Sequence, residues 1–351
     1  AMKNRDTKTE YIAYGDGNLR IEVPDRTRTV TARPPVRGVD DIEASIRAAI
    51  TQPIAHDPLP KLVGPKSKVT IAFDDISLPL PPMRRPDIRQ RVIEAVLDLA
   101  AEAGVDDVHL IAALAIHRRM TEDELRHAVG DRVYDAFAPS GRLYNHDAED
   151  PDGMVVLGQT PHGEDVQFSK RAAESDLVVY VNINLVAMDG GHKSTATGLS
   201  GYTSLRHHHN VHTMLNSRSF MDQENSALHA SNWRMGKVLR DADVKIFQIE
   251  TTVNNNTFGR EGPMSMLQKR EWEWSPKDRV GFLAMQQGLK LMPAKARRKA
   301  FSSWLAPYEL TSVQAGEVEA VHEVTTANVY KQQLVPVEGQ TDVLTMGLPY
   351  I

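Results

Sequence analysis

The sequence predicts an α/β fold with two domains, each with a mostly parallel sheet flanked by helices. Short apolar runs alternate along the chain with segments whose apolar residues recur at helical spacing. Acidic residues and glycines follow several of the apolar runs, where a parallel strand would turn into the next helix. The 351 residues are enough for two such units. We expect an N-terminal domain at residues 1–270, an incomplete C-terminal α/β domain at residues 271–351, and a ligand site in the cleft between them.

The first half of the chain begins with short alternating stretches that predict edge strands and loops, with one helix near residues 41–50. The helices that follow carry start and stop signals. Thr121 and Glu124 match a capping box, and Gly104 suits the end of a helix. We therefore expect strands at residues 69–73, 108–114, 166–168 and 177–183, helices at residues 89–103 and after residue 121, and a short helix between the last two strands.

The second half continues with further helix signals. Ser275 and Pro276 suit a helix cap and first turn, and Asp278 adds acidic charge there. Residues 260–274 lack periodicity and are interpreted as the region between the domains. We expect helices at residues 226–240, 276–291 and 294–304, strands at residues 244–249 and 342–346, and a strand or helix edge at residues 318–324.

The composition limits the classes of protein to which the chain can belong. Apolar residues make up 41% and charged residues 25% of the chain, as in an ordinary globular protein. The formal net charge of -5 argues against a nucleic-acid partner. The absence of cysteine excludes disulfides, thiolate metal sites and cysteine nucleophiles. Because neither a charged leader nor a membrane-spanning apolar run is found, we expect a cytoplasmic protein without a membrane partner.

Acidic residues and a histidine follow two of the predicted strands. Asp74 and Asp75 end the first apolar run, and Ser77 comes close behind. At the carboxyl end of a parallel strand they fit a ligand or metal contact, although such residues also form plain turns. His117 lies between a strand and a helix start, where an imidazole that titrates near neutrality can act as a general base. The alternative for His117 is a solvated loop side chain.

A glycine pair precedes a lysine farther along the chain. Gly190 and Gly191 let backbone N–H groups approach a phosphate, and Lys193 adds positive charge. The spacing differs from that of a Walker A loop. The alternative is an ordinary glycine turn beside a surface lysine.

A histidine-rich run follows at residues 207–212, with four histidines in six positions. On a helix, His208 and His212 would share one face, which suits a borderline metal ion. The alternative is a polar helix face. A histidine-metal hydrolase is the weaker interpretation, because no glutamate base lies beside these histidines.

Taken in order, these segments resemble the motifs of the lactate racemase family. The resemblance covers roughly residues 65–350, and its specificity comes from the ordered set rather than from any one motif. The matching segments are residues 74–77, 117–124, 145–147, 157–163 and 190–193, followed by His209.

The resemblance implies a cofactor, the nickel-pincer nucleotide, in which two thio groups on a pyridinium mononucleotide clamp nickel. It implies that Lys193 carries this cofactor through a thioamide bond and that His209, sixteen residues later, ligates the nickel. His117 matches one of two catalytic histidines that take the hydroxyl proton while hydride passes to the pincer ring. The other implied cofactor contacts are Asp75, Ser77, Gly190 and Gly191.

Two departures from the family pattern concern the substrate. The family's second catalytic histidine lies about ten residues before the lysine, but residues 182–186 contain no histidine here, and asparagine is not a base. We expect His192 to take this role, with His146 as the other candidate. The family's carboxylate-binding arginine is replaced by Leu78. The expected substrate contacts are instead Arg84, Arg85 and Asn184.

The resemblance therefore implies a racemase or epimerase that acts on a 2-hydroxy acid other than lactate, by hydride transfer. The implied partners are this small molecule and the enzymes of cofactor synthesis, and homo-oligomerisation is left open. Two alternatives remain within the family. One is a hydride-transfer oxidoreductase that works without inversion, for which one base suffices. The other is a catalytically degenerate homologue that still binds the nickel-pincer nucleotide.

Overall fold

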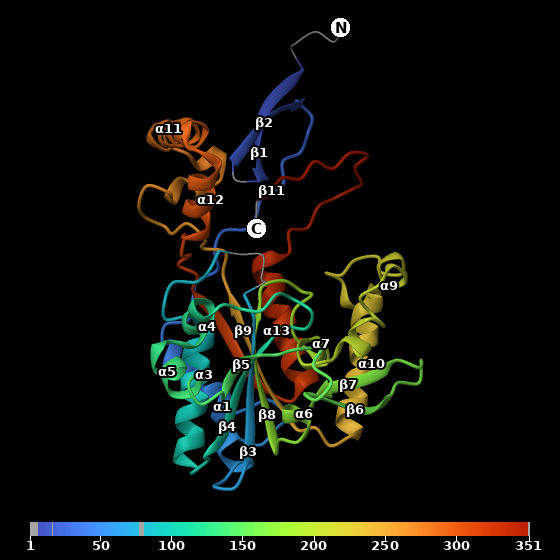
Figure 1. Ribbon diagram of the computed structural model, residues 1–351. Coiled ribbons are helices and arrows are strands. Elements are labelled where there is room, and N and C mark those ends of the chain that lie inside the picture. Colours follow the sequence, from blue (N-terminus) through green and yellow to red (C-terminus); the bar gives the residue numbers. More distant parts are fainter. Residues whose placement is uncertain (1–5, 16, 77–80, 350–351) are drawn as a thin grey trace.

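The fold is organised around a central sheet. The computed structural model describes residues 6–15, 17–76 and 81–349. In this part of the chain the sheet has the order β10-β9-β8-β3-β4-β5, with β10 antiparallel to β9 and all other neighbours parallel. Its strands are β3 (Lys68–Asp74), β4 (Asp107–Ala113), β5 (Leu143–Asn145), β8 (Leu177–Asn184), β9 (Ile246–Val253) and β10 (Leu310–Gly316). The predicted α/β class with a mostly parallel sheet is confirmed (Figure 1).

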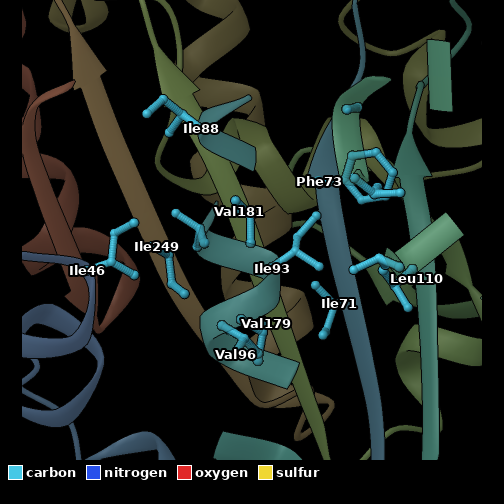
Figure 2. Close-up of a cluster of buried hydrophobic side chains, with 14 of the residues drawn as sticks. Ile46, Ile71, Phe73, Ile88, Ile93, Val96, Leu110, Val179, Val181 and Ile249 are labelled. Atoms are coloured by element: carbon cyan, nitrogen blue, oxygen red, sulfur yellow. The ribbon is translucent and has the colours of Figure 1, made fainter. Parts of the chain in front are cut away.

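One face of the central sheet carries the larger apolar core. Alternate strand residues such as Ile71, Leu110 and Val179 point to this face, as the two-residue period of a strand requires. They pack against Ile93 and Val96 of the helix α3 (Figure 2). The helices on this face are α1 (Ile42–Thr51), α3 (Ile88–Glu102), α4 (Glu122–Val129) and α5 (Asp131–Phe137).

The opposite face carries a smaller apolar core and becomes polar toward the carboxyl ends of the strands. Val178 and Tyr180 of β8 pack there against Met235, but the next residues of β8 on this face are Asn182 and Asn184. This change from apolar to polar side chains marks the end of the sheet at which a ligand site can form. The helices on this side are α6 (Lys170–Ala173), α7 (His192–Gly198), α10 (Ala227–Asp241) and α13 (Val318–Gln333).

The remaining elements lie outside the central sheet. A three-stranded sheet has the order β11-β1-β2 and, with α11 and α12, lies beyond the carboxyl end of β9 in Figure 1. A separate hairpin, β6–β7, packs on α10. The bounds are β1 (Thr7–Gly15), β2 (Gly17–Pro24), β6 (Met154–Gln159), β7 (Asp165–Ser169), β11 (Leu348–Pro349), α2 (Leu59–Leu62), α8 (Tyr202–Leu205), α9 (Val211–Leu215), α11 (Pro276–Leu291) and α12 (Ala294–Ser302), with 3-10 turns at Gln223–Asn225, Ser265–Gln268 and Glu271–Glu273.

Most predicted elements are found close to their expected bounds, but one prediction needs correction. At residues 318–324, for which a strand and a helix edge were both expected, the helix is found: these residues begin α13, and Glu317 caps its first turn through the Ala320 N–H. Residues 342–346 form no strand, and their side chains are exposed without a neighbouring strand to pair with. The division into residues 1–270 and 271–351 stays a prediction, although β10 and α13 belong to the central sheet and its cover.

Among the described residues, no helix combines the length and the apolar character needed to cross a membrane.

Candidate functional site

Several predicted site residues meet at the carboxyl ends of β3, β4 and β8. Asp75 directly follows β3, His117 lies in the loop after β4, and the Gly190–Gly191 turn follows β8. Because these three strands are neighbours and parallel, their loops leave the sheet at the same edge. The topology therefore gathers segments that are about 40 to 70 residues apart in the sequence.

A carboxylate–imidazole contact joins Asp75 to His117. The Asp75 Oδ2 atom lies 2.9 Å from His117 Nδ1. The Asp75 side chain is 8% exposed and that of His117 is 49% exposed, so the carboxylate is fixed while the imidazole reaches the surface. Arg89, itself buried in an ion pair with Asp87, holds the strand end by donating to the Asp75 carbonyl at 2.8 Å. The pair has the geometry of a carboxylate that orients a histidine base.

The His117 loop is held by its neighbours in the sequence motif. Asn145, at the end of β5, accepts from the Met120 N–H at 3.1 Å and donates to the Met120 carbonyl at 2.9 Å. Arg118 pairs with Glu124, and Arg119 pairs with Asp147. The segments 117–124 and 145–147 that matched the family are therefore in contact, and their polar residues fix the position of the histidine.

The glycine pair makes a turn that no other residue type would allow. Gly190 and Gly191 have φ angles of +91° and +59°, in the region that disfavours side chains. A Cβ atom on Gly190 would lie 2.2 Å from Asn184 Nδ2, and one on Gly191 would lie 2.7 Å from His322 Cδ2. The Gly191 N–H donates to Glu250 at 2.6 Å rather than pointing to solvent. The glycines thus let the turn approach buried polar side chains closely.

The His209 imidazole is affected by the charges of Lys193 and His117. The Lys193 Nζ atom is 3.7 Å from Asp189 Oδ1, and its side chain is 23% exposed. Partial burial lowers the pKa of His209, and the positive charges of His117 and Lys193 lower that pKa further, against the raising effect of the Leu205 carbonyl. A neutral imidazole is the form that ligates a metal. The charges of His117 and Lys193 therefore act on the His209 imidazole.

His192 is placed elsewhere, and its position does not support the predicted acid–base role. Its Nε2 atom lies 2.9 Å from Glu319 Oε1, and Glu319 also pairs with Arg240. Its Nδ1 atom is buried with no hydrogen-bond partner in the described part of the chain. A Cβ atom on Gly236 would lie 2.1 Å from this nitrogen, so the backbone of α10 closes the space on that side. The other candidate, His146, is buried and bonded to the Ser200 carbonyl.

The predicted substrate contacts are occupied by other partners. Arg85 pairs with Asp131 at 3.0 Å, and Arg84 Nε donates to the Leu305 carbonyl at 3.4 Å. Asn184 is buried and donates to the Asp189 carbonyl and to Glu250. The substrate roles of these three residues stay predictions. Ser77 and Leu78 lie outside the described residues.

The histidine-rich run does not form a metal site of its own. His208 is buried, with Nδ1 3.3 Å from Ser231 Oγ, whereas His212 is exposed on the short helix α9. The two do not share a helix face, because α9 begins only at Val211. Across the residues that the structure describes, no group of three or more His, Asp or Glu side chains is arranged to hold a metal ion. A metal here would need ligands from a bound cofactor.

Sequence reasoning missed a second histidine that pairs with a buried carboxylate. His322 of α13 lies with Nδ1 3.1 Å from Glu250 Oε2 of β9. The two residues are 72 positions apart, and neither belongs to a recognisable motif. The sequence offered one weak signal, an acidic residue directly after the strand predicted at residues 244–249; the structure extends this strand over Glu250, and a buried carboxylate is rare without a partner.

The fold and the site together define an α/β protein with polar and titratable side chains at the carboxyl edge of a parallel sheet. The profile of the family described as lactate racemase N-terminal domain matches residues 14–222. The chain belongs to the lactate racemase family. This confirms the family resemblance of the sequence motifs.

Individual relatives agree with this assignment. The chain is 26% identical over 171 residues to a lactate racemase of Lactiplantibacillus plantarum, covering 48% of this chain and 38% of that protein. It is 23% identical over 210 residues to a lactate racemase of Thermoanaerobacterium thermosaccharolyticum, covering 56% and 46%. The matches thus span less than half the length of these relatives.

A solved structure shows the same fold. The lactate racemase apoprotein from Thermoanaerobacterium thermosaccharolyticum superposes with a TM-score of 0.60 at 17% identity, covering 93% of this chain and 63% of that chain.

Proposed function

We propose that the chain is a racemase or epimerase of a 2-hydroxy acid that uses a nickel-pincer nucleotide attached at Lys193. The observation that carries this proposal is the Asp75–His117 pair, which lies in one electrostatic neighbourhood with Lys193 and His209. A base, an attachment lysine and a neutral imidazole ligand are the three protein groups that such a reaction requires. Membership of the lactate racemase family supports the assignment.

The donor set fits the proposed cofactor. The chain has no cysteine, and its described residues offer no protein-only metal cluster, so one histidine would complete a metal whose other ligands belong to a nucleotide. His209 supplies that ligand, and Lys193 supplies the covalent attachment. When bound, the cofactor accepts the C2 hydrogen of the substrate with its electron pair and returns it. The protein's own task is to bind the substrate and to move the hydroxyl proton.

His117 would act as the general acid–base group for that proton. Asp75 holds its Nδ1 atom, so the ring presents its other nitrogen to a hydroxyl group. The Asp75 carboxylate is itself buried, so it holds this nitrogen from a fixed position. Asp75 is thus a positioning residue in this proposal, in addition to the cofactor contact that the family resemblance implies.

The proposed substrate is a 2-hydroxy acid other than lactate. Leu78 stands where the family has its carboxylate-binding arginine, and Arg84 and Arg85 are engaged with Leu305 and Asp131. A carboxylate must therefore be bound by groups different from those that bind lactate. The enzymes of cofactor synthesis are the proposed protein partners, and a cytoplasmic location and homo-oligomeric assembly stay predictions.

The attachment at Lys193 is tested by mass spectrometry of the chain produced together with the cofactor-synthesis enzymes. We expect the intact mass to rise by that of the nucleotide, and the modified peptide to contain Lys193. Lys193→Arg keeps the charge but cannot form a thioamide, so it should keep the unmodified mass. Lys245→Ala removes an exposed lysine and should be modified like the wild type. An unmodified wild-type chain under these conditions would contradict the proposal.

A second candidate is a hydride-transfer oxidoreductase that does not invert its substrate. The observation that favours it is the asparagine pair at residues 182 and 184, in the region where the family has its second histidine. One base is enough for oxidation from one face. Production of the opposite enantiomer from a pure 2-hydroxy acid would exclude this candidate.

A further inference from the structure

We propose that the His322–Glu250 pair is the second acid–base group of the site. This inference rests on the proposed function, because it assigns the base that inversion requires. An alcohol carbon that is inverted through a planar carbonyl presents its oxygen in two different directions. A separate proton acceptor is therefore needed for each enantiomer.

The pair has the arrangement of an oriented base. Glu250 is fully buried in β9 and lies 3.1 Å from His322 Nδ1. A carboxylate at this nitrogen makes it the protonated one and leaves Nε2 as the acceptor. The Gln223 side-chain amide lies against this Nε2 atom, with its nitrogen at 2.7 Å and its oxygen at 3.0 Å. When Nε2 is the acceptor, the amide nitrogen donates to it, and in this proposal a substrate hydroxyl takes the place of that amide of the 3-10 turn Gln223–Asn225.

The pair is also joined to the loop that carries Lys193. Glu250 accepts the Gly191 N–H at 2.6 Å and the Asn184 amide at 3.2 Å. The absence of a side chain on Gly191 lets the His322 ring lie against the turn. The glycine pair that precedes the lysine therefore packs against this histidine and its carboxylate, while the Asp75–His117 pair follows a different strand, β3.

The other buried histidines near the loop are poorer candidates. The nitrogens of His229 are used by Ser226 Oγ and the Met188 carbonyl. Burial lowers the pKa of His229 to about 4, despite the raising effect of the Met188 carbonyl, so it is a weak base at neutral pH. His192 is enclosed between Glu319 and the backbone at Gly236. Of these three, only His322 combines a buried carboxylate with an acceptor nitrogen next to a displaceable amide.

The proposed proton transfers balance. Oxidation breaks the substrate O–H and C2–H bonds, and the proton passes to one histidine while the C2 hydrogen leaves with two electrons to the nucleotide cofactor. The C2–O bond becomes a carbonyl. Reduction returns the same electron pair and hydrogen to the opposite face of C2, and the oxygen takes its proton from the other histidine. No additional oxidant or reductant is required.

The first test follows the oxidation half of the reaction in the cofactor-loaded chain. Excess enzyme is mixed with D-malate or L-malate, quenched in acid, and the 2-oxo acid is trapped and quantified. The wild type should oxidise both enantiomers. His117→Asn and His322→Asn, which keep a donor at the Nδ1 position, should each lose a different enantiomer by about 100-fold or more. The control His162→Gln changes an exposed histidine and should match the wild type.

The outcomes separate this inference from the proposed function. Loss of the same enantiomer in both asparagine variants, or wild-type behaviour of His322→Asn, would overturn the role of His322. An unmodified Lys193 in the same preparation would instead contradict the proposed function.

A second test needs neither cofactor nor substrate. Nitrogen NMR of the histidine-labelled, unloaded chain should show His322 protonated on Nδ1 and bare on Nε2, with the signal assigned by its absence in His322→Asn. Glu250→Gln keeps an oxygen for the Gly191 N–H but should abolish this tautomer preference. A His322 protonated on Nε2 in the wild type would overturn the inference, whichever substrate the enzyme uses.

Discussion

At the residue scale, the Asp75–His117 contact explains why two separate sequence motifs serve one site. Asp75 is immobilised by burial and by Arg89, and the histidine alone reaches the surface. A fixed carboxylate restricts the tautomer and the orientation of the imidazole. The contribution of Asp75 to the reaction is therefore expected to act through His117.

Replacement of Asp75 by Asn should lower kcat by about 100-fold or more and leave KM nearly unchanged. The amide can donate to Nδ1 and so favours the wrong tautomer, whereas substrate binding does not depend on the carboxylate. Steady-state kinetics of the loaded enzyme provides the measurement. Asp243→Asn, at an exposed position outside the site, should behave like the wild type. A rise in KM at constant kcat would contradict a positioning role.

The individual site residues differ in how well the sequence predicts them. His117, Lys193 and His209 come from motifs whose order is visible in the chain, and in the structure the charges of His117 and Lys193 act on His209. His192 was a neighbour of the lysine in sequence, but the helical turn directs its ring toward Glu319. His322 is 129 residues after Lys193, and only the pairing of β9 with β8 and the packing of α13 bring it close.

At the element scale, a buried ion pair fixes the β6–β7 hairpin to α10. Glu164 accepts from Arg234 Nε at 2.7 Å, from Ser231 at 2.6 Å and from Thr160 at 2.6 Å. Burial raises the pKa of Glu164, but these hydrogen bonds outweigh it and lower the pKa to about 2. Ser231 also contacts His208, the residue before the proposed nickel ligand.

Glu164 should therefore stabilise the fold in a pH-dependent way. Its folded pKa lies below the unfolded value, so the stabilisation is present above about pH 4.5 and is lost as the pH falls toward about 2. The shift corresponds to about 3 kcal/mol. Glu164→Gln should lose stability of this order at pH 7 and show a flatter acid dependence in urea unfolding. Glu149→Gln, at another exposed glutamate, is the control, and equal acid dependence of wild type and Glu164→Gln would refute the assignment.

Elements with local signals were predicted well from the sequence. The capping boxes at Thr121 and Ser275 are both present in the structure, because side chain and backbone satisfy each other within four residues. Strand β10 was missed, since its position is set by pairing with β9 rather than by a local pattern. The strand predicted at residues 342–346 is absent for the converse reason: a segment with a strand-like sequence does not form a strand unless another strand pairs with it.

At the scale of the whole molecule, the strands β4, β3, β8 and β9 are parallel neighbours in the central sheet. This order places the candidate site residues toward the carboxyl ends of these strands. The Asp75–His117 pair lies in the loops after β3 and β4, and Glu250 of the second pair lies on β9. The loop that carries Lys193 follows β8, which lies between β9 and β3 in the sheet. Sequence periodicity predicts the parallel class, but the order of the strands emerges only from packing. In the proposed mechanism, this arrangement places the attachment lysine between two bases, as inversion requires.

The nickel content of the purified chain tests the central claim most directly. Protein produced with the cofactor-synthesis enzymes is desalted, and metal and protein are quantified in the same sample. We predict stoichiometric nickel in the wild type, almost none in Lys193→Arg, and a large loss in His209→Ala while the nucleotide mass remains on Lys193. Equal nickel in all three proteins, or nickel-free wild type that carries the nucleotide, would contradict the account.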